Sequence, residues 1–300
     1  MKLINKKFVL VFCICFLSQI LELHCQRSHN NKVKLLHDIS TYLKSEFGME
    51  ISKQFYTKWD ENETGHHVVY FSKPDEIDGH QRGFGDEKSA IDFRVKQDSL
   101  GFHTMIYHTY GSAAVRLSEH LLSYSEESIG FIGFHEATHT HFNNKGTRLP
   151  YSVNEAACDV LANYATVEFA KKDKRITYLK AKKQRKYIEK IGNLVNLASS
   201  DLKSGQTSKF IEKSRILEKK VGKLNNDYFE DSFLKDRYFY EINNAFLLRN
   251  TYYSKYYFKL KELLILTDIK TFLKVLDSLP KKEEECFAAI NTAIDEAKIP

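Results

Sequence analysis

Two histidines and a glutamate with helical spacing are the residues of this chain best suited to chemistry. The segment 135–139 reads His-Glu-Ala-Thr-His, a His-Glu-x-x-His motif. On a helix, residues four apart share a face, so His135 and His139 present two imidazole nitrogens side by side, as zinc ligands do. Glu136 lies about 100° further round the helix, beside the water that fills the open coordination position. Zinc lowers the pKa of that water. The motif therefore predicts hydrolysis with Glu136 as general base.

A catalytic zinc ion needs a third protein ligand, and the sequence offers one downstream. Glu155 lies 155 − 139 = 16 positions after His139, which is enough chain to leave the first helix, turn through 143–150 and return in a second helix. We expect Glu155 to supply an oxygen ligand. Asp159 follows one turn later on the same face, either as acceptor for the second ring N–H of a zinc histidine or as an ordinary solvent-facing carboxylate. Cys158 adjoins both, but a fourth protein ligand would close the catalytic position, so we expect no metal role for it.

These motifs resemble two groups of zinc peptidases. Asn154-Glu155-Ala156 with Asp159 is similar to the third-ligand helix of thermolysin-type gluzincins, in which the Glu binds zinc and the Asp four later supports the first His. The closer resemblance is to the predicted aminopeptidase family of Gram-negative bacteria, which has a His-Glu-x-x-His, a short loop containing Lys-Gly, here Lys145-Gly146, and then Asn-Glu. The likeness spans about 120–285 and is weaker over 33–120. Further matching segments are Ile242-Asn243-Asn244-Ala245-Phe246-Leu247, the following Tyr252-Tyr253, Ser278-Leu279-Pro280 and, more weakly, Glu46-Phe47-Gly48.

The resemblance implies a zincin-like catalytic unit that binds Zn²⁺ and hydrolyses a peptide or protein substrate, as an aminopeptidase if the family's name describes its activity. No recognisable element for a substrate N-terminal amine lies upstream, so endopeptidase and exopeptidase activity both stay open. The alternative is a non-catalytic, zinc-stabilised helical interaction domain. Glu136 argues against that alternative, because a structural metal site needs no general base.

A tyrosine is expected to stabilise the oxyanion of the tetrahedral intermediate. All 12 histidines precede Phe142, so no histidine from the second half of the chain can donate this hydrogen bond. Tyrosine is the natural substitute. Among the aromatic residues of that half, Tyr252 and Tyr253 are our candidates, and core packing is the alternative for each. The full set is Tyr238, Tyr240, Tyr252, Tyr253, Tyr256 and Tyr257.

Two adjacent asparagines just upstream are expected to bind substrate. Asn243 and Asn244 stand in an otherwise apolar and aromatic segment. Amide side chains are poor helix formers and are costly to bury without partners. We therefore expect them to face a bound peptide backbone or the zinc site.

The elements that position these residues follow from hydrophobic periodicity. Apolar residues recur with helical spacing over 33–47 and end at Gly48, whereas 66–72 and 103–110 are rich in β-branched and aromatic residues, with turn-prone polar loops between them. From about residue 117 the helical period returns, with breaks near 143–150, 203–206, 225–227 and 278–280. Helices are expected over 187–198 and 207–224, and the motif helix could begin at a capping box of Ser123 and Glu126. The sequence thus predicts an α+β fold, in which a small-sheet part (26–118) and a helical part (119–300) form one catalytic unit.

Composition and the N-terminus bear on location and partners. With 42% hydrophobic and 28% charged residues, the 300-residue chain is globular, and its net charge of +6 is only mildly basic. Residues 1–25 join a basic start to an apolar run too short for a bilayer, which predicts a signal peptide and export; a membrane anchor and lipid attachment at Cys25 are the alternatives. Export disfavours a nucleic-acid partner, so the basic run 171–190 is interpreted as a solvated helix face. After removal of the signal peptide, Cys158 and Cys286 are the remaining cysteines, either as two buried thiols or as a disulfide. The oligomeric state stays open.

Overall fold

The computed structural model describes residues 28–59, 66–74, 79–109, 116–203 and 242–299, together with 212, 215–217, 219 and 237. Several expectations lie outside the described residues: the signal peptide 1–25 with Cys25, most of the helix 207–224, and Tyr238 and Tyr240.

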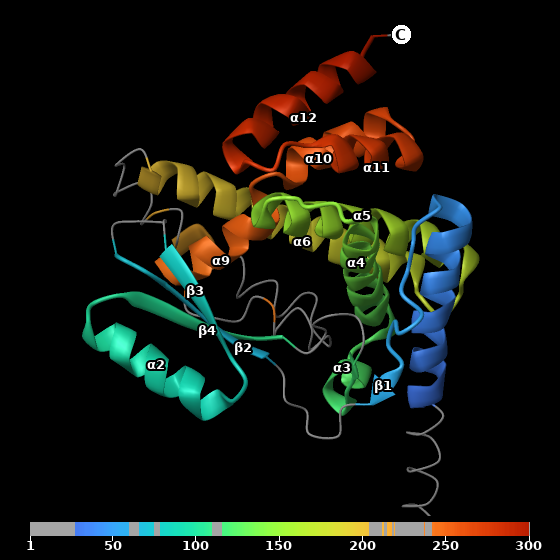
Figure 1. Ribbon diagram of the computed structural model, residues 1–300. Helices are drawn as coiled ribbons and strands as arrows, with labels where there is room; N and C mark the ends of the chain where they lie inside the picture. The colour runs from blue at the N-terminus through green and yellow to red at the C-terminus, as the bar shows by residue number, and fades with distance from the viewer. Residues whose placement is uncertain are drawn as a thin grey trace, which may run out of the picture.

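The described chain combines a small sheet with many helices (Figure 1). The strands are β1 (Lys58–Trp59), β2 (His66–Ser72), β3 (Gly79–Phe84), β4 (His103–Thr109) and β5 (Arg116–Leu117). A helix over 28–47 precedes them. The later helices are α2 (Glu87–Ser99), α3 (Glu119–Ser123), α4 (Glu126–Lys145), α5 (Tyr151–Lys172), α6 (Tyr178–Lys203), α9 (Asn244–Ser254), α10 (Tyr257–Leu266), α11 (Ile269–Ser278) and α12 (Glu283–Ala297).

The sheet lies between two helices. Its order is β3-β2-β4, both pairings are antiparallel, and β1 and β5 form a separate short parallel pair. Successive side chains of a strand point to opposite faces. Phe71 of β2 accordingly contacts Phe93 of α2, while its neighbour Tyr70 lies near Tyr252 of α9. The sheet therefore places α9 on one face and α2 on the other (Figure 1).

Helix α5 is the central element of the helical part and packs against α4, α6, α9, α10 and α12. Its buried residues include Ala156, Ala157 and Ala162, small side chains that let neighbouring helices approach closely. On α4, a Cβ at Gly133 would lie only 2.9 Å from Leu36, so this glycine lets the helix over 28–47 pack directly on α4. One hydrophobic cluster extends from Leu35 to Ile294, so both parts of the chain share a core.

The structure is mixed, mainly helical with a small sheet, which is compatible with the predicted α+β class, and several of the predicted elements form. The first helix ends at residue 47 before Gly48, which has φ +67, and the two expected strands form as β2 and β4. Residues 187–198 belong to the longer helix α6, which buries Ile188, Ile191, Val195 and Ala198 as the periodicity predicts.

Two local predictions are wrong. The segment between the expected strands is not only loops, because it holds β3 and the helix α2, capped by Asp86. Helix α2 buries only Ala90 and Gln97 in full, so it lacks the apolar stripe that reveals a helix in sequence. The motif helix α4 begins at Glu126 and is capped by Ser125, whose side chain accepts from the Ser128 amide, and not by Ser123, which ends α3.

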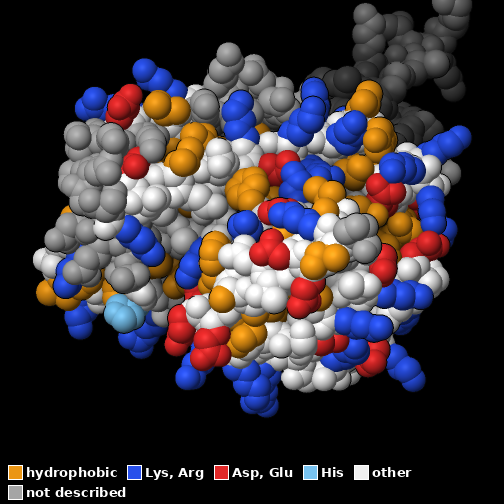
Figure 2. Space-filling view, turned by 90° about the horizontal axis from the view of Figure 1, so that it is seen from above, with side chains coloured by type: hydrophobic (Ala, Val, Ile, Leu, Met, Phe, Trp, Pro, Cys, Tyr) orange, Lys and Arg blue, Asp and Glu red, His pale blue; other side chains and the backbone are white. Residues whose placement is uncertain are grey.

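The basic run 171–190 forms a solvated helix face, as expected. Its lysines are mostly exposed, while Ala181, Tyr187 and Ile188 point into the core. Salt bridges offset part of the charge, including Arg185 with Glu189 at 2.9 Å. On the face seen in Figure 2, basic and acidic side chains are interspersed. Within the described residues, no helix combines the length and the apolar character needed to cross a bilayer.

Candidate metal centre

The two motif histidines lie side by side on the buried side of α4. Their Nε2 atoms are 3.1 Å apart and their rings meet edge to face, with centroids 4.8 Å apart. His135 is almost completely buried, whereas the side chain of His139 is 22% exposed. The pair is therefore reachable from the His139 side.

Glu155 of α5 faces the same two nitrogens. Its Oε2 lies 3.3 Å from Nε2 of His135, and its Oε1 lies 3.6 Å from Nε2 of His139. Ligand atoms of a tetrahedral zinc ion with bonds near 2.05 Å are separated by about 3.3 Å. The two nitrogens lie close to this separation from each other, and each lies near it from a different oxygen of the Glu155 carboxylate, so this donor set fits a metal ion.

Both histidines have an acceptor at the other ring nitrogen. Asp159 Oδ1 lies 2.9 Å from Nδ1 of His135, and Asn154 Oδ1 lies 3.1 Å from Nδ1 of His139. An acceptor at Nδ1 favours the tautomer that leaves Nε2 free to bind a metal. Asp159 is 1% exposed, so it is not a solvent-facing carboxylate. Asn154 belongs to the motif that suggested the third-ligand helix, but sequence reasoning gave its side chain no role.

Cys158 also lies at the centre, on another side of His139. His135, His139 and Cys158 each offer a ligand atom within 4.8 Å of the others, and this group could hold a metal ion. However, the Cys158 Sγ lies 3.3 Å from Nδ1 of His139, the nitrogen that Asn154 also contacts, whereas Glu155 faces Nε2. Burial and the nearby carboxylates of Glu155, Glu136 and Asp159 raise the pKa of the thiol well above its usual value. Cys158 and Cys286 are both buried and free, so the disulfide alternative is wrong.

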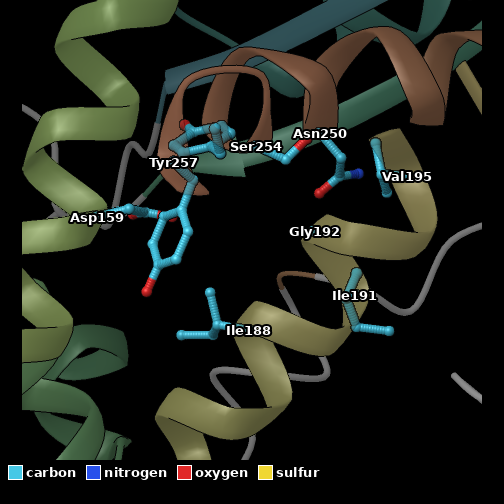
Figure 3. Close-up of a pocket in the computed structure, with 9 residues that line it drawn as sticks. Asp159, Ile188, Ile191, Gly192, Val195, Asn250, Ser254 and Tyr257 are labelled. Carbon is cyan, nitrogen blue, oxygen red and sulfur yellow. The ribbon is translucent and has the colours of Figure 1, made fainter. Parts of the chain in front are cut away.

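Arg237 anchors the carboxylate behind the histidines. Its Nη2 lies 2.5 Å from Oδ2 of Asp159, and both side chains are buried. This contact joins residues 78 positions apart, and no local pattern in the sequence indicated it. A small cavity adjoins Asp159, walled by Ile188 and Gly192 of α6 and by Tyr257 (Figure 3).

The carboxylates around His135 favour a positive charge at this centre. Burial alone would lower the pKa of His135, but its contacts with Asp159 and Glu155 outweigh burial and raise the pKa to about 10. Burial alone would raise the pKa of Glu155, but hydrogen bonds from His135 and His139 hold it well below its usual range. The centre is thus built around one positive charge.

Glu136 is positioned differently from Glu155. It is half-buried, and burial raises its pKa, while the two histidines act in the opposite direction. A raised pKa brings a carboxylate closer to that of an effective general base at neutral pH. Glu136 lies within electrostatic reach of His139, His135 and Glu155, and no described contact joins its carboxylate to theirs.

The two candidate tyrosines point to different places. The ring of Tyr253 lies 6.3 Å from that of His135, and the guanidinium groups of Arg237 and Arg249 lie 4.8 and 4.9 Å from the Tyr253 ring. Tyr252 contacts the rings of Tyr70 and Tyr151. Tyr253 is therefore the tyrosine beside the metal centre.

The asparagine pair attaches α9 to the sheet. Asn243 caps α9 and donates to the Thr104 carbonyl of β4, and Asn244 donates to the carbonyls of Lys73 and Pro74. These contacts satisfy the amide donors with the protein's own backbone. Substrate binding by the pair stays a prediction to which the described contacts add no support.

Comparison with family models, with curated proteins and with solved structures yields no match for this chain. The resemblance to the predicted aminopeptidase family therefore rests on the motif residues themselves.

Proposed function

We propose that this chain is an exported zinc-dependent metallopeptidase whose motifs resemble those of the predicted aminopeptidase family. The observation that carries the proposal is the convergence of two Nε2 atoms and the Glu155 carboxylate at distances of 3.1, 3.3 and 3.6 Å. A half-buried carboxylate with a raised pKa adjoins them. This arrangement joins a metal-binding triangle to a general base, as metal-assisted hydrolysis requires.

Each residue has one task in this proposal. His135, His139 and Glu155 would hold zinc, which when bound supplies a Lewis acid for a peptide carbonyl and lowers the pKa of water. Glu136 accepts a proton from that water and returns it to the leaving amine. Tyr253 donates a hydrogen bond to the oxyanion.

Zinc content and peptidase activity together test the proposal. The wild-type protein should carry one zinc ion per chain and cleave a peptide library in a chelator-sensitive way, read by mass spectrometry. Cleavage confined to N-terminal residues would identify an aminopeptidase, and internal cleavage an endopeptidase. A zinc-loaded protein that cleaves no peptide of the library would contradict the proposal.

A second candidate function is a non-catalytic metal-stabilised domain, and the position of Cys158 is the observation that favours it. A thiolate ligand beside two histidines would help to close the coordination sphere, as in structural zinc sites. The two candidates differ in their ligands. Glu155→Ala should abolish zinc binding in the peptidase and Cys158→Ser should retain it, whereas the structural site predicts the reverse.

A further inference from the structure

A second pair of histidines lies on the sheet. His67 of β2 and His108 of β4 are directly opposite each other in the antiparallel register. Their Nδ1 atoms are 2.8 Å apart, and their rings meet edge to face with centroids 4.7 Å apart. Directly opposite residues of antiparallel strands have Cβ atoms about 4.5–5.5 Å apart. The pairing of the strands therefore brings two metal-ligating nitrogens together.

The pair lies on the face of the sheet that α2 covers. Residues two apart on a strand share a face, so His67 lies on the same face as Phe71, which contacts Phe93 of α2. Tyr70, on the other face, lies near Tyr252 of α9, and α9 packs on α5, which carries Glu155. The pair and the candidate metal centre thus lie on opposite faces of the sheet (Figure 1). Both histidines are half-buried, so a small ion can reach them.

A carboxylate lies at the same end of the sheet. Asp86, the N-cap of α2, follows Phe84 by two residues, and Phe84 is the β3 partner of His67. Hydrogen bonds from Ser89 hold the pKa of Asp86 below its usual value, and His67 contributes in the same direction. Asp86 therefore stays ionised at neutral pH and supplies negative charge near the pair.

The short separation of the two Nδ1 atoms fits one class of ion best. Two neighbouring ligands of a square-planar or tetragonal ion, with bonds of about 2.0 Å at right angles, are about 2.8 Å apart. Tetrahedral zinc separates its ligands by about 3.3 Å. Square-planar and tetragonal sites are typical of Cu²⁺ and Ni²⁺, and Cu²⁺ binds most tightly among the divalent ions of the first row. Without an ion, the same contact is a hydrogen bond in which the two nitrogens share one proton.

We propose that His67 and His108 form a second metal site, which binds Cu²⁺ through both Nδ1 atoms, with water completing the coordination sphere. The ion replaces the shared proton and joins β2 to β4, and the charge of Asp86 favours its binding. The site uses none of the zinc ligands, so the inference goes beyond the proposed function and does not depend on it.

The test adds Cu²⁺ to the zinc-loaded protein. We expect one equivalent to bind with a micromolar dissociation constant while zinc stays bound. The electron paramagnetic resonance spectrum should be tetragonal and split by two nitrogen nuclei. At about 100 times the dissociation constant, Cu²⁺ should raise the melting temperature by about 5 °C, because an ion that binds only the folded chain stabilises it.

His67→Gln and His108→Gln each remove one ligand, while the amide can keep a hydrogen bond to the remaining imidazole. Each change should weaken Cu²⁺ binding about 10²-fold, because the second ligand of a chelate binds intramolecularly. His66→Gln is the matched control, since His66 is the exposed neighbour on the other face of β2. It should keep the wild-type affinity for Cu²⁺. Zinc content should be unchanged in all three variants.

Three outcomes would overturn the second site. One is equal Cu²⁺ affinity in the wild type and in both ligand variants, and another is a wild type without micromolar Cu²⁺ binding. The third is copper that only displaces zinc, since the ion would then occupy the zinc ligands. If a ligand variant fails to fold, the wild-type spectrum decides, because a signal without nitrogen splitting also overturns the site. None of these measurements requires cleavage of a peptide, so failure of the peptidase function is read separately.

Discussion

The two sides of the metal centre are built in different ways. On one side, α4 and α5 carry the three proposed zinc ligands within 21 residues of sequence, from His135 to Glu155. On the other side, Tyr253 of α9 is flanked by Arg237 and Arg249, and the latter stacks on Tyr107 of β4 at 3.8 Å. On the α4–α5 side, helical spacing places the ligands. The α9 side depends on contacts between distant segments, and one of these, between Arg237 and Asp159, reaches the carboxylate behind His135.

The difference suggests a division of labour. The α4–α5 side holds carboxylates that attract a cation. The α9 side holds the buried guanidinium groups of Arg249 and of Arg237, which pairs with Asp159, and these favour developing negative charge. Charges of opposite sign on the two sides of a site polarise a carbonyl placed between them. The predictions below separate the contributions of the two sides.

The largest effect is expected on the α4–α5 side, at the base. Glu136→Gln should lower turnover about 10³-fold, because the proton acceptor is lost while the ligands remain. Zinc content should stay at the wild-type level, and the melting temperature should not fall, because a buried carboxylate with a raised pKa is replaced by a neutral amide. A variant that cleaves peptides at a rate comparable to wild type would remove Glu136 from the mechanism.

On the α9 side, Tyr253→Phe should lower kcat about 10²-fold, the effect of losing one oxyanion donor. Tyr252→Phe is the internal control, because Tyr252 faces Tyr70 and Tyr151. Steady-state kinetics on a fluorogenic peptide can compare the two variants. Equal losses in both would show that α9 acts through packing and not through one hydroxyl.

Behind the ligands, Asp159→Asn should weaken zinc binding about 10-fold to 100-fold, because the acceptor that orients His135 loses its charge. Asp277→Asn serves as the matched control, since Asp277 binds Lys145 and Thr147 at the surface. Competition with a chromophoric chelator measures both affinities. An unchanged affinity in Asp159→Asn would assign Asp159 to the fold alone.

Zinc affinity should rise about 10-fold for each pH unit between pH 6.5 and 8, since a ligand must lose one proton before it binds. The pKa of His135 is raised to about 10 in the metal-free protein, so its proton is bound throughout this range and must leave. By the same linkage, the pair with Glu155 stabilises the metal-free fold fully below pH 6.5, and this stability is lost as pH rises toward 10. Calorimetry in buffers of different ionisation enthalpy counts the released proton. Zinc binding without proton release would contradict the protonation of His135.

The smallest effect on turnover is expected at the asparagine pair. Asn244→Ala removes hydrogen bonds to the carbonyls of Lys73 and Pro74 and should cost about 1–3 kcal/mol of folding free energy. The rate per folded molecule should change little. A rate that falls by more than about 10-fold at unchanged stability would support the prediction that Asn244 binds substrate, because an amide that donates to substrate also acts in the transition state.

The two sides of the metal centre also differ in how much of each could be predicted from the sequence. The ligand side could be predicted, because residues i and i+4 share a helix face whatever the helix packs against. The pairing of Arg237 with Asp159 could not, since it joins residues 78 positions apart. Helix α2 was missed because a polar surface helix has no apolar stripe. Proximity to the asparagine pair in the sequence narrowed the candidates for the oxyanion donor to Tyr252 and Tyr253. Only their packing shows that Tyr253 is the one beside the metal centre.

X-ray absorption spectroscopy of the zinc-loaded protein tests the central claim most directly, because sulfur and nitrogen or oxygen ligands lie at different distances. We predict a shell of nitrogen and oxygen ligands alone, at about 2.0–2.1 Å, from His135, His139 and Glu155. The spectrum of Cys158→Ser should be identical, and Glu155→Ala should lose the metal. A sulfur ligand at about 2.3 Å that disappears in Cys158→Ser would contradict the account and establish a histidine and cysteine site in its place.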